Sequence, residues 1–359
     1  MNILLKMVQI GWRGHRHLLS IDDFSREEFE TIFATADILH TYSGEGKQLD
    51  LLKGFILKPV FFEPSSRTQN SFEAAMLAMG GSTLSPHSNS TSSMEKGETQ
   101  ADTIITNAQY ADFLVIRHPQ KNSVRNFTKL LDGQTNRAKI INAGDGPNEH
   151  PTQALMDLHT IFKKFNTLDN LTFLLVGDLK YGRTVHSLTL GARKFNNTKI
   201  VGFPVGNLKL PNALRKNDYS ELDLGQLPKF IKDLNPNSKT VIYATRIQWE
   251  RMAKKIHKDF DKLDSSIKNQ IKREIVSQFN YKISKELLDS TPSQTILLHP
   301  LPKGEEINDE LFYSNNPKVV PIEQMRYGLS VRMAILGLFA GKEKEISTLY
   351  NGLSDISSN

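Results

Sequence analysis

Short apolar runs alternate with helical patterns along most of this chain, and this alternation restricts the fold more than any other feature. The apolar runs lie at 55–62, 113–116, 139–141, 171–176, 199–203, 240–243 and 295–298. A helix between two strands carries the chain back to the starting end of the sheet, which favours parallel pairing. The length of 359 residues corresponds to about two domains of roughly 150 residues. The sequence therefore predicts an α/β fold with two domains, each a mainly parallel sheet flanked by helices.

Helix signals give the domain organisation. Ser25 and Glu28 have the spacing of a capping box, which predicts the start of the first helix. The pattern at 151–165 opens with a proline, which is favoured in the first turn of a helix, and we expect this helix to join the two domains. We predict a first domain over 1–160, with 1–17 as an N-terminal extension, and a second domain over 161–327.

Composition excludes several classes of function. Lys plus Arg exceed Asp plus Glu by 45 to 39, and acidic residues are interspersed in the lysine-rich stretch 252–290, which is typical of a solvated helical face. We expect no nucleic-acid partner. No apolar run reaches the roughly 18 residues of a membrane span. The absence of cysteine excludes disulfides, thiolate metal sites and cysteine nucleophiles. These features predict a cytoplasmic protein. The chemistry that the motifs below imply requires no metal or other cofactor.

Polar residues follow six of the predicted strands. In open parallel sheets the ligand site lies beyond the carboxyl ends of the strands, so these residues are the candidates for a binding site. They are Ser65-Ser66-Arg67-Thr68, Arg117, His150, the segment 177–184 with Arg183, the pair Arg246 and Gln248, and the segment 299–302.

The segment Ser65-Ser66-Arg67-Thr68 stands at the predicted start of a helix that Gly80 and Gly81 end. Free backbone N–H groups and the positive end of the helix dipole favour an anion there. Arg67 can add a two-pronged contact to phosphate oxygens. The alternative is that one serine caps the helix and that Arg67 faces solvent. Capping accounts for one hydroxyl only, so we expect a phosphate or carboxylate site.

The segment Gly177–Thr184 nearly matches the P-loop of nucleotide-binding proteins, but Arg183 stands where that motif has lysine. Arginine is not an equivalent replacement for that compact charge, so we expect Arg183 to contact a substrate carboxylate. The alternative is an exposed arginine in a turn.

His150 follows a predicted strand, as Arg117 does, and could donate a hydrogen bond to an oxyanion. No second histidine stands at zinc-ligand spacing. A single histidine is more often structural than catalytic, and this alternative stays open from the residues alone.

Taken together, the motifs resemble a known family. They are FFEPSSRT (61–68), SSMEKGET (92–99), RHPQ (117–120), HPTQALMDLHTI (150–161), GDLKYGRTVHSL (177–188), TRIQ (245–248) and HPLP (299–302). Their sequence and order resemble the catalytic chains of the aspartate carbamoyltransferases, in the aspartate/ornithine carbamoyltransferase family, from about residue 18 to about residue 341.

The resemblance implies transfer of the carbamoyl group of carbamoyl phosphate to the amine of L-aspartate, giving N-carbamoyl-L-aspartate and phosphate, in pyrimidine synthesis. It also implies the aspartate/ornithine carbamoyltransferase fold. In that fold the first domain binds carbamoyl phosphate, the second binds aspartate, and a C-terminal helix, here about 328–345, completes the first domain.

The resemblance assigns a role to each candidate residue. Those assigned to carbamoyl phosphate are Ser65, Ser66, Arg67, Thr68, Ser92, Lys96, Arg117, His150, Gln153, Pro300 and Leu301. Those assigned to aspartate are Lys96, Arg183, Arg246 and Gln248. The catalytic group is His150, Arg67, Thr68, Arg117 and Lys96. Ser92 and Lys96 would reach the site of a neighbouring subunit, which implies a homotrimer with shared sites.

Two alternatives remain open. Ornithine carbamoyltransferases share the phosphate motif but usually carry a cysteine in place of Pro300, and this chain has none. A catalytically inactive homologue that serves as a structural partner of dihydroorotase would be expected to lose the phosphate and carbonyl contacts, whereas the corresponding residues are present here. The sequence does not say whether a regulatory chain or a dihydroorotase binds, or what 1–17 and 252–290 do.

Overall fold

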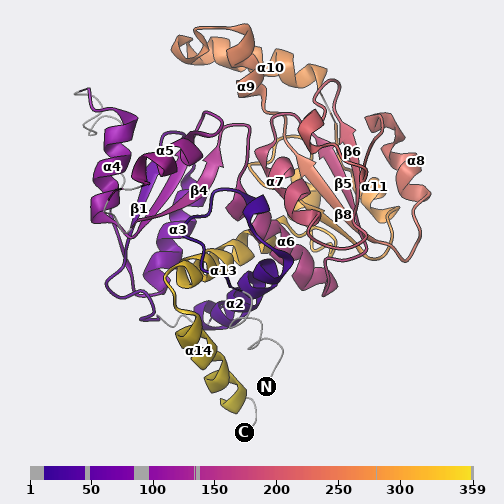
Figure 1. The fold of residues 1–359 in the computed structure, drawn as a ribbon. Coiled ribbons are helices and arrows are strands. Elements are labelled where there is room, and N and C mark those ends of the chain that lie inside the picture. The colour runs from indigo at the N-terminus through magenta and orange to yellow at the C-terminus, as the bar shows by residue number, and fades with distance from the viewer. Residues whose placement is uncertain are drawn as a thin grey trace. The chain divides into compact units, whose positions relative to one another are not determined.

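The structure, a computed structural model, describes residues 12–44, 49–84, 97–132, 134, 138–279 and 281–356 (Figure 1). The chain forms two compact units. The first comprises Met1–His159 with Met325–Asn359, and the second comprises Thr160–Gln324. Both crossings between units fall inside helices, namely α6 (Pro151–Phe165) and α13 (Pro321–Phe339).

The first unit contains a parallel sheet of four strands. In spatial order these are β2 (Ser82–Thr83), β1 (Ile56–Phe61), β3 (Phe113–His118) and β4 (Lys139–Asp145). Its other elements are η1 (Ile21–Asp23), α2 (Arg26–Gly44), α3 (Ser66–Ala78), α4 (Gln100–Tyr110), α5 (Ser123–Leu131), α14 (Glu343–Ile356) and the parts of α6 and α13 that fall in this unit.

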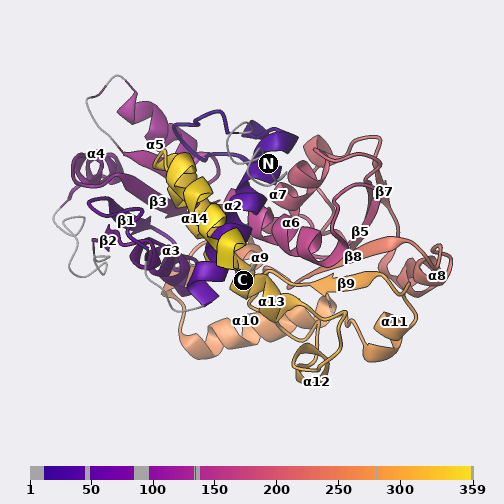
Figure 2. The same ribbon diagram turned by 90° about the horizontal axis from the view of Figure 1, so that it is seen from below.

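Both faces of this sheet are covered by helices. Apolar side chains of α4 and α5 form one core with β1, β3 and β4, while α3 and α13 lie on the opposite side (Figure 1). α2 begins as predicted, because the backbone N–H of Ser25 donates to Glu28 and the Ser25 hydroxyl accepts from the N–H of Glu28. α14 lies along α2 (Figures 1 and 2), where Ile346 packs against Ala34 and Ile38.

The described part of the N-terminal extension contacts the body of the first unit. The ring of Trp12 lies 5.1 Å from that of Phe339 and 6.1 Å from that of Phe24. His15 hydrogen-bonds Glu28 at 2.7 Å, and Nδ1 of His17 accepts from the N–H of Ile140. Residues 1–11 lie outside the described part of the chain.

The second unit contains a parallel sheet of five strands. In spatial order these are β7 (Tyr219–Glu221), β6 (Lys199–Pro204), β5 (Leu171–Gly177), β8 (Lys239–Thr245) and β9 (Thr295–Leu298). Its helices are α7 (Arg183–Ala192), η4 (Asn212–Leu214), η5 (Leu224–Gln226), α8 (Leu227–Lys232), α9 (Trp249–Ile256), η6 (Phe260–Lys262), α10 (Ser265–Gln278), α11 (Lys285–Asp289) and α12 (Asp309–Phe312).

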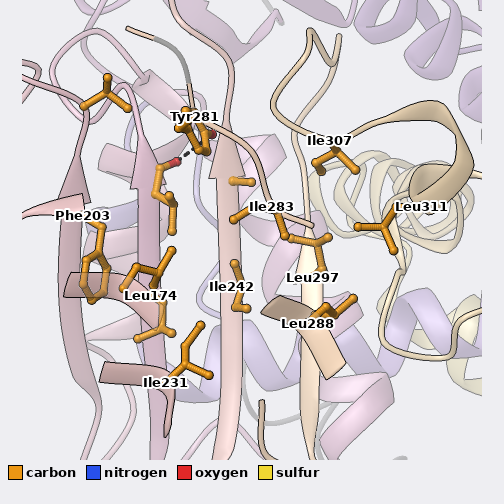
Figure 3. Packing of buried hydrophobic residues seen from close by; sticks show 14 of the residues in the cluster. Leu174, Phe203, Ile231, Ile242, Tyr281, Ile283, Leu288, Leu297, Ile307 and Leu311 are labelled. Carbon is orange, nitrogen blue, oxygen red and sulfur yellow. Dashed lines mark hydrogen bonds between the residues drawn. The ribbon is translucent and has the colours of Figure 1, made fainter. Parts of the chain in front are cut away.

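One core of the second unit lies on the face of its sheet where a row of side chains from β6, β5, β8 and β9 packs against α8 and α11 (Figure 3). Leu174, Ile242 and Leu297 are fully buried in this row, and Ile231 of α8 packs onto it. Tyr281 closes the same cluster at the carboxyl ends of the strands (Figure 3).

The two parallel-sheet units confirm the predicted fold class, and each of the seven predicted strands is present. The sequence patterns missed β2 and β7, which are edge strands of two and three residues and therefore too short to carry a periodic signal. Most of the lysine-rich stretch 252–290 is helical, as predicted, in α9, η6, α10 and α11. α10 buries Ile271 and Ile275, while Ile267 is exposed. Of the helices in the described residues, none is long and apolar enough to cross a membrane.

Candidate active site

In the first unit, the segment after β1 places hydroxyl groups at the start of a helix. Ser65 is the N-cap residue of α3, yet its side chain makes no capping hydrogen bond. Its hydroxyl instead donates to Oγ1 of Thr68 at 3.1 Å. Ser66 and Arg67 are exposed, and Thr68 is buried. Because the Ser65 side chain does not cap this end, the start of the helix suits an anion.

Arg117 stands at the end of β3, next to this helix start. It pairs in register with Phe61 at the end of β1, and the strand pairing on its other side shifts between Ile116 and His118. Such an irregularity bends the strand and redirects a side chain. The guanidinium of Arg117 lies 3.1 Å from Glu63 and donates to the carbonyl of Ala143 at 3.2 Å. These contacts hold a cation between the ends of three adjacent strands.

A loop between β4 and α6 delivers His150. Asp145 accepts from the N–H groups of Asn122 and Glu149, both at 3.0 Å. Glu149 accepts from the Ser20 hydroxyl and the Ile21 N–H, and burial raises the pKa of this carboxyl. The loop is therefore fixed by two acidic side chains, and it places the buried His150 at the start of α6.

Gln153 lies in the first turn of α6, three residues after His150, and is also buried. Its Nε2 donates to Oδ1 of Asp157, one turn further along the helix, at 2.8 Å. The first unit thus brings Ser65–Thr68, Arg117, His150 and Gln153 to the carboxyl ends of β1, β3 and β4, which are neighbours in one sheet.

In the second unit, a buried carboxylate joins the ends of β5 and β8. Asp178 follows β5 and accepts from the N–H groups of Lys180, Tyr181 and Gln248 at 2.9–3.1 Å. Burial raises the pKa of Asp178, whereas these N–H groups and the charge of Arg246 oppose that shift. Asp178 therefore ties the loop that leads to Arg183 to the loop that carries Arg246 and Gln248.

The two arginines occupy different places in these loops. Arg183 is the first residue of α7 and is buried, which does not fit the alternative of an exposed turn arginine. Arg246 follows β8, and its Nη1 lies 2.9 Å from Glu250 and donates to the carbonyl of Ile247. Gln248 is the N-cap residue of α9.

Tyr281 also holds the carboxyl ends of β5 and β8 in place. Its hydroxyl accepts from the N–H of Thr245 at 3.0 Å and donates to the carbonyl of Thr245 at 2.6 Å. The carbonyl of Val176 lies 3.2 Å from the same hydroxyl (Figure 3). Gly177 has a φ of +113°, and a Cβ there would lie 2.6 Å from the Tyr281 hydroxyl. Only glycine satisfies both conditions, which explains the first glycine of the P-loop-like segment.

The segment after β9 presents backbone groups. Nδ1 of His299 accepts from the N–H of Leu301 at 2.9 Å, and its Nε2 lies 2.8 Å from Glu306. Burial lowers the pKa of His299, which is consistent with a neutral ring that donates to Glu306. The N–H of Leu301 is thus engaged within the segment, so the groups that Pro300 and Leu301 can offer a ligand are carbonyl oxygens. Leu301 has a φ of +54°, which is uncommon outside glycine and frequent at ligand sites.

A cavity of about 300 Å³ lies beside Arg246 in the second unit. Its charged lining includes Arg246, Lys272 and Lys303 on one hand and Glu250 and Glu306 on the other, and Trp249 and Phe279 supply apolar walls. Because its lining includes residues that follow β8 and β9, we treat the cavity as part of the candidate site in this unit.

Two predicted site residues, Ser92 and Lys96, lie outside the described residues. The other candidates fall into two groups, one at the strand ends of each unit. The residue patterns did not single out Asp178, Tyr281 or Asp157, whose partners and burial the structure reveals. The one signal for Asp178 was its position after Gly177, since aspartate commonly accepts backbone hydrogen bonds in turns.

Comparison with known proteins shows that both groups of residues belong to domains of one protein family. One family model, described as aspartate/ornithine carbamoyltransferase, carbamoyl-P binding domain, matches residues 16–163. A second, described as aspartate/ornithine carbamoyltransferase, Asp/Orn binding domain, matches residues 169–339. The chain belongs to the aspartate/ornithine carbamoyltransferase family. Each family model thus covers one of the two groups of candidate residues.

Several members of the family are similar over nearly the whole chain. The aspartate carbamoyltransferase catalytic subunit of Thermococcus kodakarensis is 38% identical over 92% of this chain and 99% of its own length. That of Methanothrix thermoacetophila is 39% identical over 89% and 97%. The crystal structure of aspartate transcarbamoylase from Trypanosoma cruzi in complex with carbamoyl phosphate and aspartate has a TM-score of 0.75 and 31% identity, covering 89% of this chain and 95% of that one.

Replacing Tyr281 by phenylalanine tests how the second unit holds its strand ends. Tyr281→Phe leaves the N–H of Thr245 buried without its partner, so we expect the free energy of unfolding to fall by about 1–3 kcal/mol. Urea unfolding followed by circular dichroism measures the change. Tyr313→Phe, at a tyrosine that is 67% exposed, is the matched control, and equal midpoints for the two variants would contradict the assigned role.

Proposed function

We propose that this chain transfers the carbamoyl group of carbamoyl phosphate to the amine of L-aspartate, giving N-carbamoyl-L-aspartate and phosphate in de novo pyrimidine synthesis. The observation that carries the choice of aspartate is the pair of arginines, Arg183 and Arg246, in loops joined by Asp178 at the ends of adjacent strands. Two guanidiniums suit a dicarboxylate and repel a diamine such as ornithine.

The first unit is assigned to carbamoyl phosphate. The start of α3, with Ser65, Ser66, Arg67 and Thr68, receives the phosphate, and Arg117 adds a second guanidinium. This assignment is supported by the uncapped helix end and by the name of the family model that matches 16–163. Phosphate leaves more readily when fixed cations and N–H groups stabilise the charge that it gains.

The reacting carbonyl is assigned to His150, Thr68 and Arg117. The neutral amine of aspartate attacks the carbonyl carbon, and the carbonyl oxygen gains negative charge. The bond between carbon and the phosphate oxygen then breaks, and the leaving phosphate takes a proton from the amine. Hydrogen-bond donors held in place before reaction stabilise this oxyanion without reorganisation. The carbamoyl amide is assigned to Gln153 and to the carbonyl oxygens of Pro300 and Leu301.

The second unit is assigned to aspartate, with Arg183, Arg246 and Gln248 as its contacts and Lys96 as a further one. Support comes from the matching family model for an Asp/Orn binding domain. It also comes from the names of the relatives, which are aspartate carbamoyltransferase catalytic subunits. The residues that the resemblance assigns to phosphate and to the carbonyl are all present in this sequence, which disfavours an inactive homologue.

Substitution of His150 tests the catalytic assignment. His150→Ala should lower kcat by about two to three decades, because one oxyanion donor is lost, while the affinity for carbamoyl phosphate changes only a few-fold. Steady-state formation of N-carbamoyl-L-aspartate and calorimetric binding measure the two quantities. The control is His257→Ala, at an exposed histidine. A wild-type kcat for His150→Ala would refute the assignment.

We also propose a cytoplasmic homotrimer in which Ser92 and Lys96 complete the site of a neighbouring subunit, as the resemblance of the segment 92–99 implies. Mixing two inactive variants tests this arrangement. Lys96→Ala and His150→Ala chains, dissociated and reassembled together, should recover activity far above either parent, because some sites then contain neither substitution. Arg117→Ala mixed with His150→Ala should recover none, since both positions belong to one chain's share of the site. No recovery in the first mixture would contradict shared sites.

A further inference from the structure

Two buried polar side chains stand one turn apart on α6. Gln153 is 7% exposed and Asp157 is 0% exposed. Residues four apart lie on the same face of a helix, and Nε2 of Gln153 donates to Oδ1 of Asp157 at 2.8 Å. Polar groups this deeply buried must find partners, because an unmade hydrogen bond is costly there.

The acidic partner determines which way the amide faces. A glutamine side chain has one donor end and one acceptor end, whereas a carboxylate only accepts. With Nε2 turned to Asp157, Oε1 is the end presented elsewhere. The reverse orientation would press two acceptor oxygens together with no hydrogen between them, inside a buried site. A neutral amide partner would allow both orientations, so the carboxylate chemistry is decisive.

The charge of a buried arginine on α13 interacts with Asp157. Arg332 of α13 is 4% exposed. Its guanidinium lies 5.2 Å from the ring centre of Phe72 on α3, and its Nη1 donates to the carbonyl of Gly328 at 2.9 Å. Burial lowers the pKa of Arg332 to about 10, and the charge of Asp157 opposes that shift. Arg332 thus stays protonated at neutral pH, and its charge interacts with Asp157.

We propose that Asp157 is a positioning residue that holds the carbonyl oxygen of Gln153 toward the substrate, so that the site selects an amino group over a methyl group. The proposal rests on the proposed function, which places Gln153 at the carbamoyl amide. The amino group of carbamoyl phosphate can donate to that oxygen. Acetyl phosphate carries a methyl group in the same place and would leave the oxygen unpaired, and sites built to receive a donor reject ligands that lack it.

The first variant is Asp157→Asn in the full-length protein, which keeps the shape but introduces a donor that lets the Gln153 amide turn over. We expect kcat/KM for carbamoyl phosphate to fall about 10- to 100-fold. Inhibition constants for acetyl phosphate and inorganic phosphate should change no more than about three-fold. Equal weakening of all three ligands, with a lowered melting temperature, would mean a structural role only and would overturn the proposal.

A matched pair on another helix supplies the control. Gln69 donates from Nε2 to Glu73 with the same four-residue spacing on α3, at 3.2 Å. Glu73→Gln makes the same chemical change next to the phosphate motif, outside the residues assigned to substrate. It should leave both kcat/KM and the preference for carbamoyl over acetyl phosphate unchanged, and an effect as large as that of Asp157→Asn would overturn the proposal.

Two further variants separate this inference from the proposed function. Gln153→Met should remove most of the preference for carbamoyl over acetyl phosphate. Adding Asp157→Asn to this variant should not reduce the preference further. If Gln153→Met leaves the preference intact, the assignment of Gln153 to the amide is wrong and the inference falls with it. If Gln153→Met reduces the preference but Asp157→Asn does not, only the inference falls.

A swapped pair keeps the test informative even if Asp157→Asn alone does not fold. In the double variant Gln153→Glu with Asp157→Asn, the introduced asparagine donates and the introduced carboxylate presents an acceptor oxygen to substrate. The preference for carbamoyl over acetyl phosphate should recover at least about ten-fold relative to Gln153→Met. Both ligands carry the same phosphate, so the added charge affects them alike. No recovery of the ratio would contradict the proposal.

Discussion

Parallel pairing of the strands is the constraint on which the rest of this structure depends. Every pairing between the named strands is parallel, so all carboxyl ends of one sheet lie along one edge. The loops after β1, β3 and β4 bring the phosphate motif, Arg117 and His150 together in the first unit. The loops after β5, β8 and β9 do the same for Arg183, Arg246 and the segment 299–302 in the second. This edge of each sheet is where we expect ligands to bind, because ligand sites form beyond the carboxyl ends of such sheets.

Loops that carry charges need fixed backbones, and buried polar side chains supply this rigidity. Asp145 and Glu149 hold the loop before His150, Asp178 joins the β5 and β8 loops, and the pair His299–Glu306 fixes the segment after β9. Each of these groups accepts or donates hydrogen bonds that would be costly to break in a buried setting. The loops that carry the cations are thereby fixed, which the proposed catalysis through a preorganised site requires.

The elements with a strong periodic or capping signal could be predicted from sequence to within a residue or two. α6 runs over Pro151–Phe165 and β9 over Thr295–Leu298, as the pattern of apolar residues indicated. The motifs also located the strand ends that carry charge. Two of the groups that the residue patterns missed have partners that are distant along the chain. Tyr281 is 36 residues from Thr245, and Asp178 is 70 from Gln248. Local patterns contain no information on such contacts. The positions of Ser92 and Lys96 remain predictions.

We propose that the cations at these strand ends serve a carbamoyl donor and a dicarboxylate acceptor. The most direct test is phosphate release from carbamoyl phosphate by the purified chain, with L-aspartate and with L-ornithine in parallel. We expect release with aspartate, matched one to one by N-carbamoyl-L-aspartate, and no release above background with ornithine. Turnover with ornithine alone, or with neither acceptor, would contradict it.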